Sequence, residues 1–110
     1  MTTAPRPRMT TLQAYASHGS TSYGEISPGR FAEIVKGDTP TAGEKVSVCQ
    51  GLTEMPTTSI NRDVAGELAV EVGVTRAALD ARCQQLCGGA LGAYAFPAVL
   101  PLPPKLTPGS

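Results

Sequence analysis

The sequence predicts an α+β fold: a β-rich small single domain with one late helix at about residues 75–88 and extended N- and C-terminal arms. Two short apolar runs in residues 25–60 are separated by turn-forming Gly, Pro and Thr, as is usual for strands of a small sheet. The 110 residues include 12 Gly and 10 Pro, so loops and arms take a large share of the chain. This length fits one domain with a modest core.

The composition divides the chain into three parts. Residues 1–24 are predicted to be an extended N-terminal arm, residues 25–90 the small globular domain, and residues 91–110 a Pro-rich apolar C-terminal arm. The first arm is rich in Thr, Ser, Pro and Gly, and its one apolar cluster includes Leu12 and Tyr15. We expect these two side chains to anchor the arm on a partner.

The segment 25–60 supports two interpretations. Phe31, Ile34 and Val35 follow a Pro-Gly turn, and Val46 and Val48 alternate with polar residues, which is the period of a half-buried strand. We therefore favour strands.

The alternative for the same segment is a pair of helices. Ser27 would be the N-cap of the first, with Pro28 at its first position and Gly37 as its end. Thr41 and Glu44 would form a capping box for the second.

Residues 24–54 also carry a resemblance. The order Pro28-Gly29-Arg30-Phe31, then Thr41 to Lys45, then Val46 to Gly51 resembles small head-decoration (cement) proteins of tailed phages. That resemblance implies a β-rich fold, binding to the outside of a capsid lattice, and extended arms that hold neighbouring subunits together.

Residues 75–88 are predicted to be the late helix. Thr75 can cap a run rich in Ala, Leu, Arg and Gln, which are strong helix formers, and Gly88-Gly89 provides an end. Leu79, Cys83 and Leu86 recur at helical spacing and mark its buried face.

Residues 66–84 resemble a helix-turn-helix, the unit that lays its second helix in the major groove of DNA. Leu68, Ala69 and Val72 would pack the first helix, Gly73 would form the turn, and Val74 and Leu79 would seat the second. Arg82 departs from the pattern, because such units usually have an apolar residue there. On this alternative the DNA-facing residues are Thr75, Arg76, Asp80 and Gln84.

The C-terminal arm alternates apolar residues with Pro, so an extended, polyproline-like structure is expected. Its Gly and Pro residues would break any membrane-spanning helix in the uncharged stretch 83–104. Five large apolar side chains on this arm are expected to bind a neighbouring subunit: Tyr94, Phe96, Val99, Leu100 and Leu102.

The three cysteines are predicted to be reduced, metal-free and at least partly buried. Cys83 and Cys87 are four residues apart, and Cys49 and His18 would complete a Cys3His zinc site. Strong zinc motifs have two closely spaced ligand pairs, however, and only one is present. We therefore expect no metal, because small buried thiols behave as hydrophobes. An odd number of cysteines without a signal peptide indicates a reducing compartment.

Charge and motifs disfavour several function classes. Nine basic and nine acidic residues give zero net charge, so no global field attracts nucleic acid or an anionic membrane. His18 is the only histidine, and no phosphate loop, nucleophile elbow or metal-binding helix motif occurs. We predict a protein that is not an enzyme, with no catalytic residues and no cofactor.

The function predicted from the sequence is structural. The chain would be an assembly subunit that binds other subunits of a large assembly, as a homo-oligomer or on a capsid lattice. A virion head-decoration (cement) protein or a minor structural protein would have this role. We expect a virion or cytoplasmic location, no membrane partner, and no secretion by a signal peptide, since residues 10–22 are polar. The alternative is a helix-turn-helix DNA-binding regulator.

Overall fold

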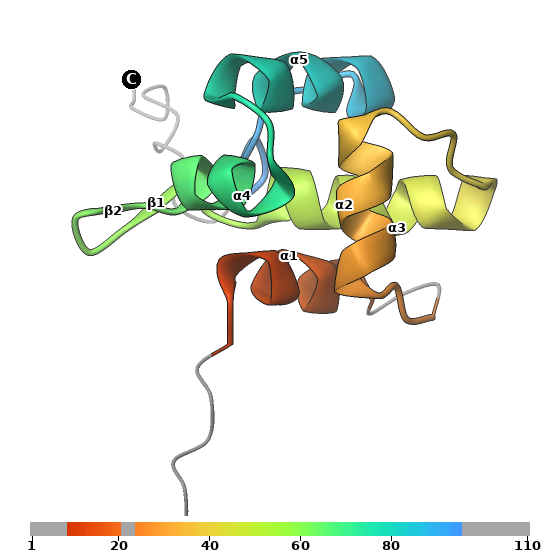
Figure 1. The fold of residues 1–110 in the computed structure, drawn as a ribbon, viewed down its shortest axis with the longest axis horizontal. Coiled ribbons are helices and arrows are strands. Elements are labelled where there is room, and N and C mark those ends of the chain that lie inside the picture. Colours follow the sequence, from red (N-terminus) through yellow and green to blue (C-terminus); the bar gives the residue numbers. More distant parts are fainter. Residues whose placement is uncertain (1–8, 21–23, 96–110) are drawn as a thin grey trace, which may run out of the picture.

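The fold is helical, so the prediction of a β-rich domain is wrong. A computed structural model of the chain describes residues 9–20 and 24–95. Within these ranges the elements follow the order shown in Figure 1: α1 (Thr11–Gly19), α2 (Pro28–Lys36), α3 (Ala42–Glu54), β1 (Thr58–Ser59), β2 (Arg62–Asp63), α4 (Val64–Val72) and α5 (Arg76–Cys87).

Polar caps begin all five of these helices. Each cap side chain accepts a hydrogen bond from a backbone N–H of the first turn, which would otherwise lack a partner. Capping boxes occur at α1, where Gln13 completes the box, and at α3, where Glu44 does. The alternative of two helices in residues 25–60 is thereby confirmed. The five N-caps are Thr10, Ser27, Thr41, Asp63 and Thr75.

Apolar spacing explains why strands do not form in this segment. Phe31, Ile34 and Val35 lie on one helical face and are at most 3% exposed. Val48 and Leu52, four residues apart, are both fully buried, whereas Val46 is 37% exposed. The alternation of Val46 with Val48 is therefore a short coincidence within a helical pattern.

The prediction of an extended N-terminal arm is also wrong for residues 11–19. Residues 11–19 form α1, and Tyr15 at its centre is fully buried against Phe31, with ring centroids 6.4 Å apart. The Tyr15 hydroxyl donates to the carbonyl oxygen of Pro56 at 3.4 Å, and burial raises the pKa of Tyr15 to about 12. This segment is part of the core.

The helix α3 is the centre of the packing. In Figure 1, α1 and α5 lie on opposite sides of it, and α2 runs from α1 to α5 and contacts both. A Cβ atom at Gly51 of α3 would lie 2.7 Å from the carbonyl oxygen of Tyr15, and a Cβ atom at Gly19 of α1 would clash with the carbonyl oxygen of Ser47. These two glycines allow α1 and α3 to approach closely.

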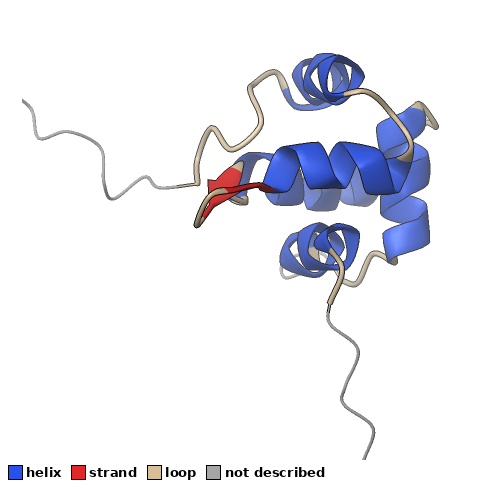
Figure 2. Cartoon of the chain, turned by 60° about the vertical axis from the view of Figure 1, so that its left-hand side comes forward, coloured by secondary structure: helices blue, strands red, loops and turns tan. Residues whose placement is uncertain are grey.

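A short antiparallel hairpin precedes α4 and lies at the edge of the helical body (Figure 2). Thr58 pairs with Asp63 and Ser59 with Arg62, so a two-residue turn joins the strands. Ile60 and Asn61 in that turn both have positive φ, at 45° and 65°. Among the residues described, no helix is long and apolar enough to cross a membrane.

Candidate nucleic-acid interface

The helices α4 and α5 are joined by a three-residue turn. Gly73 ends α4 in the left-handed conformation with φ 94°, and the Val74 N–H donates to the Ala69 carbonyl at 2.9 Å. The Thr75 hydroxyl then accepts from the Ala78 N–H and begins α5. This is the connection that the helix-turn-helix alternative predicted.

The inner faces of the two helices also match that alternative. Leu68 and Leu79 are fully buried, and Ala69 and Val72 are at most 4% exposed. Val74 in the turn packs against the same core while partly exposed. Burial of the inner face fixes which residues of α5 point outward.

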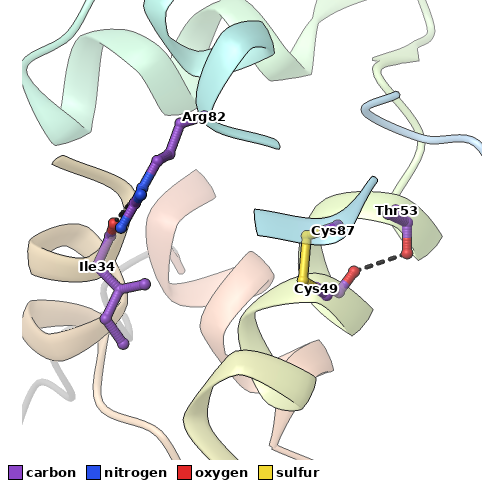
Figure 3. Close-up of a disulfide and its surroundings, with 5 residues drawn as sticks. All are labelled: Ile34, Cys49, Thr53, Arg82 and Cys87. Atoms are coloured by element: carbon purple, nitrogen blue, oxygen red, sulfur yellow. Dashed lines mark hydrogen bonds between the residues drawn. A yellow bond between two sulfur atoms is a disulfide. The ribbon is translucent and has the colours of Figure 1, made fainter. Parts of the chain in front are cut away.

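Arg82, the residue that departs from the pattern, joins α5 to the end of α2. Its Nε donates to the Ile34 carbonyl oxygen at 2.9 Å, and its Nη2 donates to the Asp38 carbonyl oxygen at 2.7 Å. Figure 3 shows Arg82 extending from α5 to the Ile34 carbonyl. The guanidinium therefore satisfies backbone acceptors at a helix C-terminus, where an apolar residue would only fill space.

A disulfide between Cys49 and Cys87 fastens the other end of α5 to α3 (Figure 3). The prediction of three reduced thiols is therefore wrong for this pair. Cys83 is free and fully buried, and burial raises the pKa of its thiol to about 11. No sequence pattern indicates this pairing, because the two bonded cysteines lie on different helices.

The outward face of α5 is polar and accessible. Arg76, Asp80 and Gln84, all predicted as DNA-facing, are exposed, and small Ala77 and Ala81 lie between them. Thr75 is exposed too, but its hydroxyl already caps the helix. The structure thus places Arg76, Asp80 and Gln84 on the exposed side of α5, and Thr75 at its N-cap in a structural role.

Asp63 and Arg76 hold the first turns of α4 and α5 together. The Arg76 Nη1 lies 3.0 Å from the Asp63 Oδ1, and its Nε lies 3.6 Å from Asp80. Asp63 also accepts from the Gly66 N–H as the N-cap of α4. The positive ends of two helix dipoles therefore lie near one another at this corner of the molecule.

Two carboxylates of α4 are directed at α1. Glu71 accepts from the Leu12 N–H at 2.7 Å, and Glu67 accepts from the Thr11 hydroxyl at 2.8 Å. Glu67 is also paired with Arg62, and hydrogen bonds from Arg62 and Thr11 lower its pKa to about 2. Since α4 lies between α1 and α5 (Figure 1), these acids lie away from the outward face of α5.

The possible zinc ligands do not assemble. Cys49 and Cys87 are bonded to each other, and His18 lies 3.0 Å from Glu54 on the surface. No group of three or more metal-binding side chains occurs within the described ranges.

The predicted partner-binding residues are dispersed. Tyr15 is fully buried and therefore unavailable to a partner, and Leu12 is partly exposed and packs against the core. Tyr94 is 64% exposed, and its backbone N–H donates to the Thr53 carbonyl at 2.7 Å. The other four lie outside the described residues: Phe96, Val99, Leu100 and Leu102.

Comparison of the chain with protein-family models, curated proteins and solved structures finds no match. The geometry of the α4–α5 unit is therefore the basis for a functional proposal.

Proposed function

We propose that the chain is a helix-turn-helix protein that binds duplex DNA, with α5 in the major groove. The observation that carries this proposal is the α4–α5 unit, in which a left-handed Gly73 turn and a buried inner face leave the outward side of α5 exposed from its first residue. In such units the N-terminal residues of the second helix contact base edges.

The chemistry of the α5 surface supports DNA over a protein partner. Gln recognises A through paired hydrogen bonds and acidic groups accept from C, so Gln84 and Asp80 are suitable side chains for bases, and the guanidinium of Arg76 is suitable for a phosphate. Protein interfaces instead centre on large apolar or aromatic residues. The large exposed apolar residues in the described ranges all lie outside α5: Met9, Val46, Ile60, Val70 and Tyr94.

Charge limits the strength of the proposed complex. Phosphate contacts supply most non-specific affinity, and on α5 Arg76 is paired with Asp63 and Asp80 while Arg82 bonds carbonyl groups of the α2 region. Exposed ion pairs are weak, at about 0–1 kcal/mol, so phosphate can displace either partner of Arg76. We expect a modest affinity with a shallow salt dependence.

The test is selection of bound duplexes from a randomised pool by the full chain. A short enriched motif is the expected result. The matched variant carries Arg76→Ala and Gln84→Ala, which leave the buried face of α5 unchanged, and it should enrich no motif. Equal enrichment by both proteins would refute the proposal.

Assembly with other subunits is a second candidate function, favoured by Tyr94. This aromatic side chain is exposed beside Val46, and both line a groove between α3 and the end of α5. Sedimentation at rising protein concentration tests it: Tyr94→Ala should lower any self-association, whereas a wild-type chain that stays monomeric throughout would oppose a homo-oligomer. The capsid-lattice role rests on the resemblance at residues 24–54, and the β-rich fold expected from it does not form.

A further inference from the structure

The Cys49–Cys87 disulfide lies at the edge of the core and is open to solvent. Both cysteines are partly exposed, and both line an open groove of about 610 Å³ between α3 and the end of α5. A groove of this volume is large enough for a small molecule. Cys83, one turn earlier on α5, is fully buried. A thiol in solution can therefore reach the disulfide but not the free cysteine.

The disulfide is one of several attachments between α3 and the end of α5. Leu86, next to the bonded cysteine, is buried in the core. Beyond α5, the backbone N–H groups of Gly92 and Tyr94 donate to carbonyl groups at the end of α3, at 2.8 and 2.7 Å. These contacts do not depend on the disulfide. The bond can therefore open and close without unfolding of the domain.

The two sulfur atoms of the bond differ in their electrostatic surroundings. Cys87 is the last residue of α5, where the negative end of the helix dipole disfavours a thiolate. Cys49 lies within α3, and Lys45, four residues earlier, lines the same groove with its positive charge. Glu54 also lines the groove, but its carboxylate lies 3.0 Å from His18. In thiol–disulfide exchange the sulfur that holds a negative charge more easily is the better leaving group, which here is that of Cys49.

We propose that Cys87 forms a reversible mixed disulfide with a small thiol that enters this groove. The incoming thiolate forms a bond to the Cys87 Sγ and the Cys49–Cys87 bond breaks. The electron pair of that bond stays on the Cys49 sulfur, which takes up the proton released by the thiol. Attack by Cys49 in the reverse direction restores the disulfide and releases the small thiol.

This exchange needs no other oxidant or reductant, and it does not depend on DNA binding. The odd number of cysteines predicts a reducing compartment, where disulfides are usually transient, catalytic or redox-sensing. An exposed bond between two elements that stay packed without it suits such reversible chemistry.

The test adds glutathione to the full chain, purified without reductant, at neutral pH and without denaturant. The reaction is stopped at early times with N-ethylmaleimide, and the modified residues are located by peptide mass spectrometry. The expected product carries glutathione on Cys87 and maleimide on Cys49, with Cys83 unmodified.

Two matched lysine variants test the choice of leaving group. Lys45→Gln should slow formation of the adduct about twofold, because the leaving sulfur loses a nearby positive charge at an exposed site. Lys36→Gln on α2 removes an equally exposed charge away from the groove and should leave the rate unchanged. Equal rates in the two variants would contradict the role given to Lys45.

Gly43→Ala distinguishes reaction of the folded chain from reaction after unfolding. A side chain at Gly43 meets open space, so the substitution should stabilise the fold while leaving the adduct rate unchanged. A rate that falls in proportion to the added stability would show that the disulfide reacts only in the unfolded chain, and the inference would be wrong. It would also be wrong if glutathione were found equally on Cys49 and Cys87, or if no adduct formed before denaturation.

Discussion

Asp63 and Arg76 join the first turns of two helices that are separated by a tight turn. Their side chains meet at 3.0 Å, and both remain about half exposed. Asp63 is the cap of α4, and Arg76 is the first residue of α5. Under the proposed function, this carboxylate competes with DNA phosphate for Arg76.

Asp63→Asn should therefore strengthen duplex binding. Asn is as good an N-cap as Asp, so the free energy of unfolding should change by less than about 0.5 kcal/mol. Removal of the negative charge frees Arg76 for phosphate, and affinity in low salt should rise about two- to fivefold. Fluorescence anisotropy on the selected duplex measures this. A fall in affinity would contradict the role given to Arg76.

The close contact between α1 and α3 predicts opposite effects of two Gly→Ala substitutions in α3. Gly51→Ala would push a methyl group into the Tyr15 carbonyl and the Phe31 ring and should cost about 1–3 kcal/mol. Gly43→Ala meets open space and should stabilise the helix by up to about 1 kcal/mol. Urea unfolding followed by circular dichroism separates the two. Equal effects would mean that the helices do not pack at Gly51.

Thiol counting tests the Cys49–Cys87 bond. Purified without reductant, the folded chain should react slowly with a thiol reagent, and the denatured chain should expose one thiol, that of Cys83. Reduction should raise the count to the three cysteines of the sequence. Because the bond closes a loop with a sequence separation of 38, its loss should lower the free energy of unfolding by about 2–4 kcal/mol. Three thiols before reduction would exclude the bond.

Acid should destabilise the fold through Glu44 and Glu67. Hydrogen bonds from Arg30 lower the pKa of Glu44 to about 2, and those from Arg62 and Thr11 lower the pKa of Glu67 to about 2, from the ordinary 4.5. A lowered folded-state pKa gives stability that is present above pH 4.5 and is lost as the pH falls towards 2. Between pH 4.5 and 2, the free energy of unfolding should depend less steeply on pH in Glu44→Gln than in the wild type, and the same should hold for Glu67→Gln. Unchanged slopes would contradict these pairings.

Part of the fold was predictable from the sequence. The late helix and the turn at Gly73 follow from strong helix formers bounded by Thr75 and Gly88, and the α4–α5 core follows from the spacing of Leu68, Val72 and Leu79. For α2 and α3 the sequence carries two conflicting signals: the alternation of Val46 and Val48 favours a strand, whereas the caps at Ser27 and Thr41 favour helices. Capping residues were the better signal there.

The remaining features depend on contacts between distant segments. Nothing near Arg82 in sequence indicates that it reaches the Ile34 carbonyl, and Cys49 and Cys87 meet only after α3 and α5 pack. The composition of residues 1–24 favoured an extended arm, but burial of Tyr15 and the bonds of Glu71 to the start of α1 stabilise a helix. Tertiary packing overrides local preference in that segment.

The central claim is that α5 contacts DNA from its first turn, and the affinity of Arg76→Ala for the selected duplex tests it most directly. The control is Lys45→Ala, because Lys45 is an exposed basic residue of α3 beside the opposite end of α5. We predict that Arg76→Ala lowers affinity about fivefold or more and reduces the log–log salt slope by roughly one, while Lys45→Ala changes neither. Equal losses in both variants, or none in either, would contradict the account.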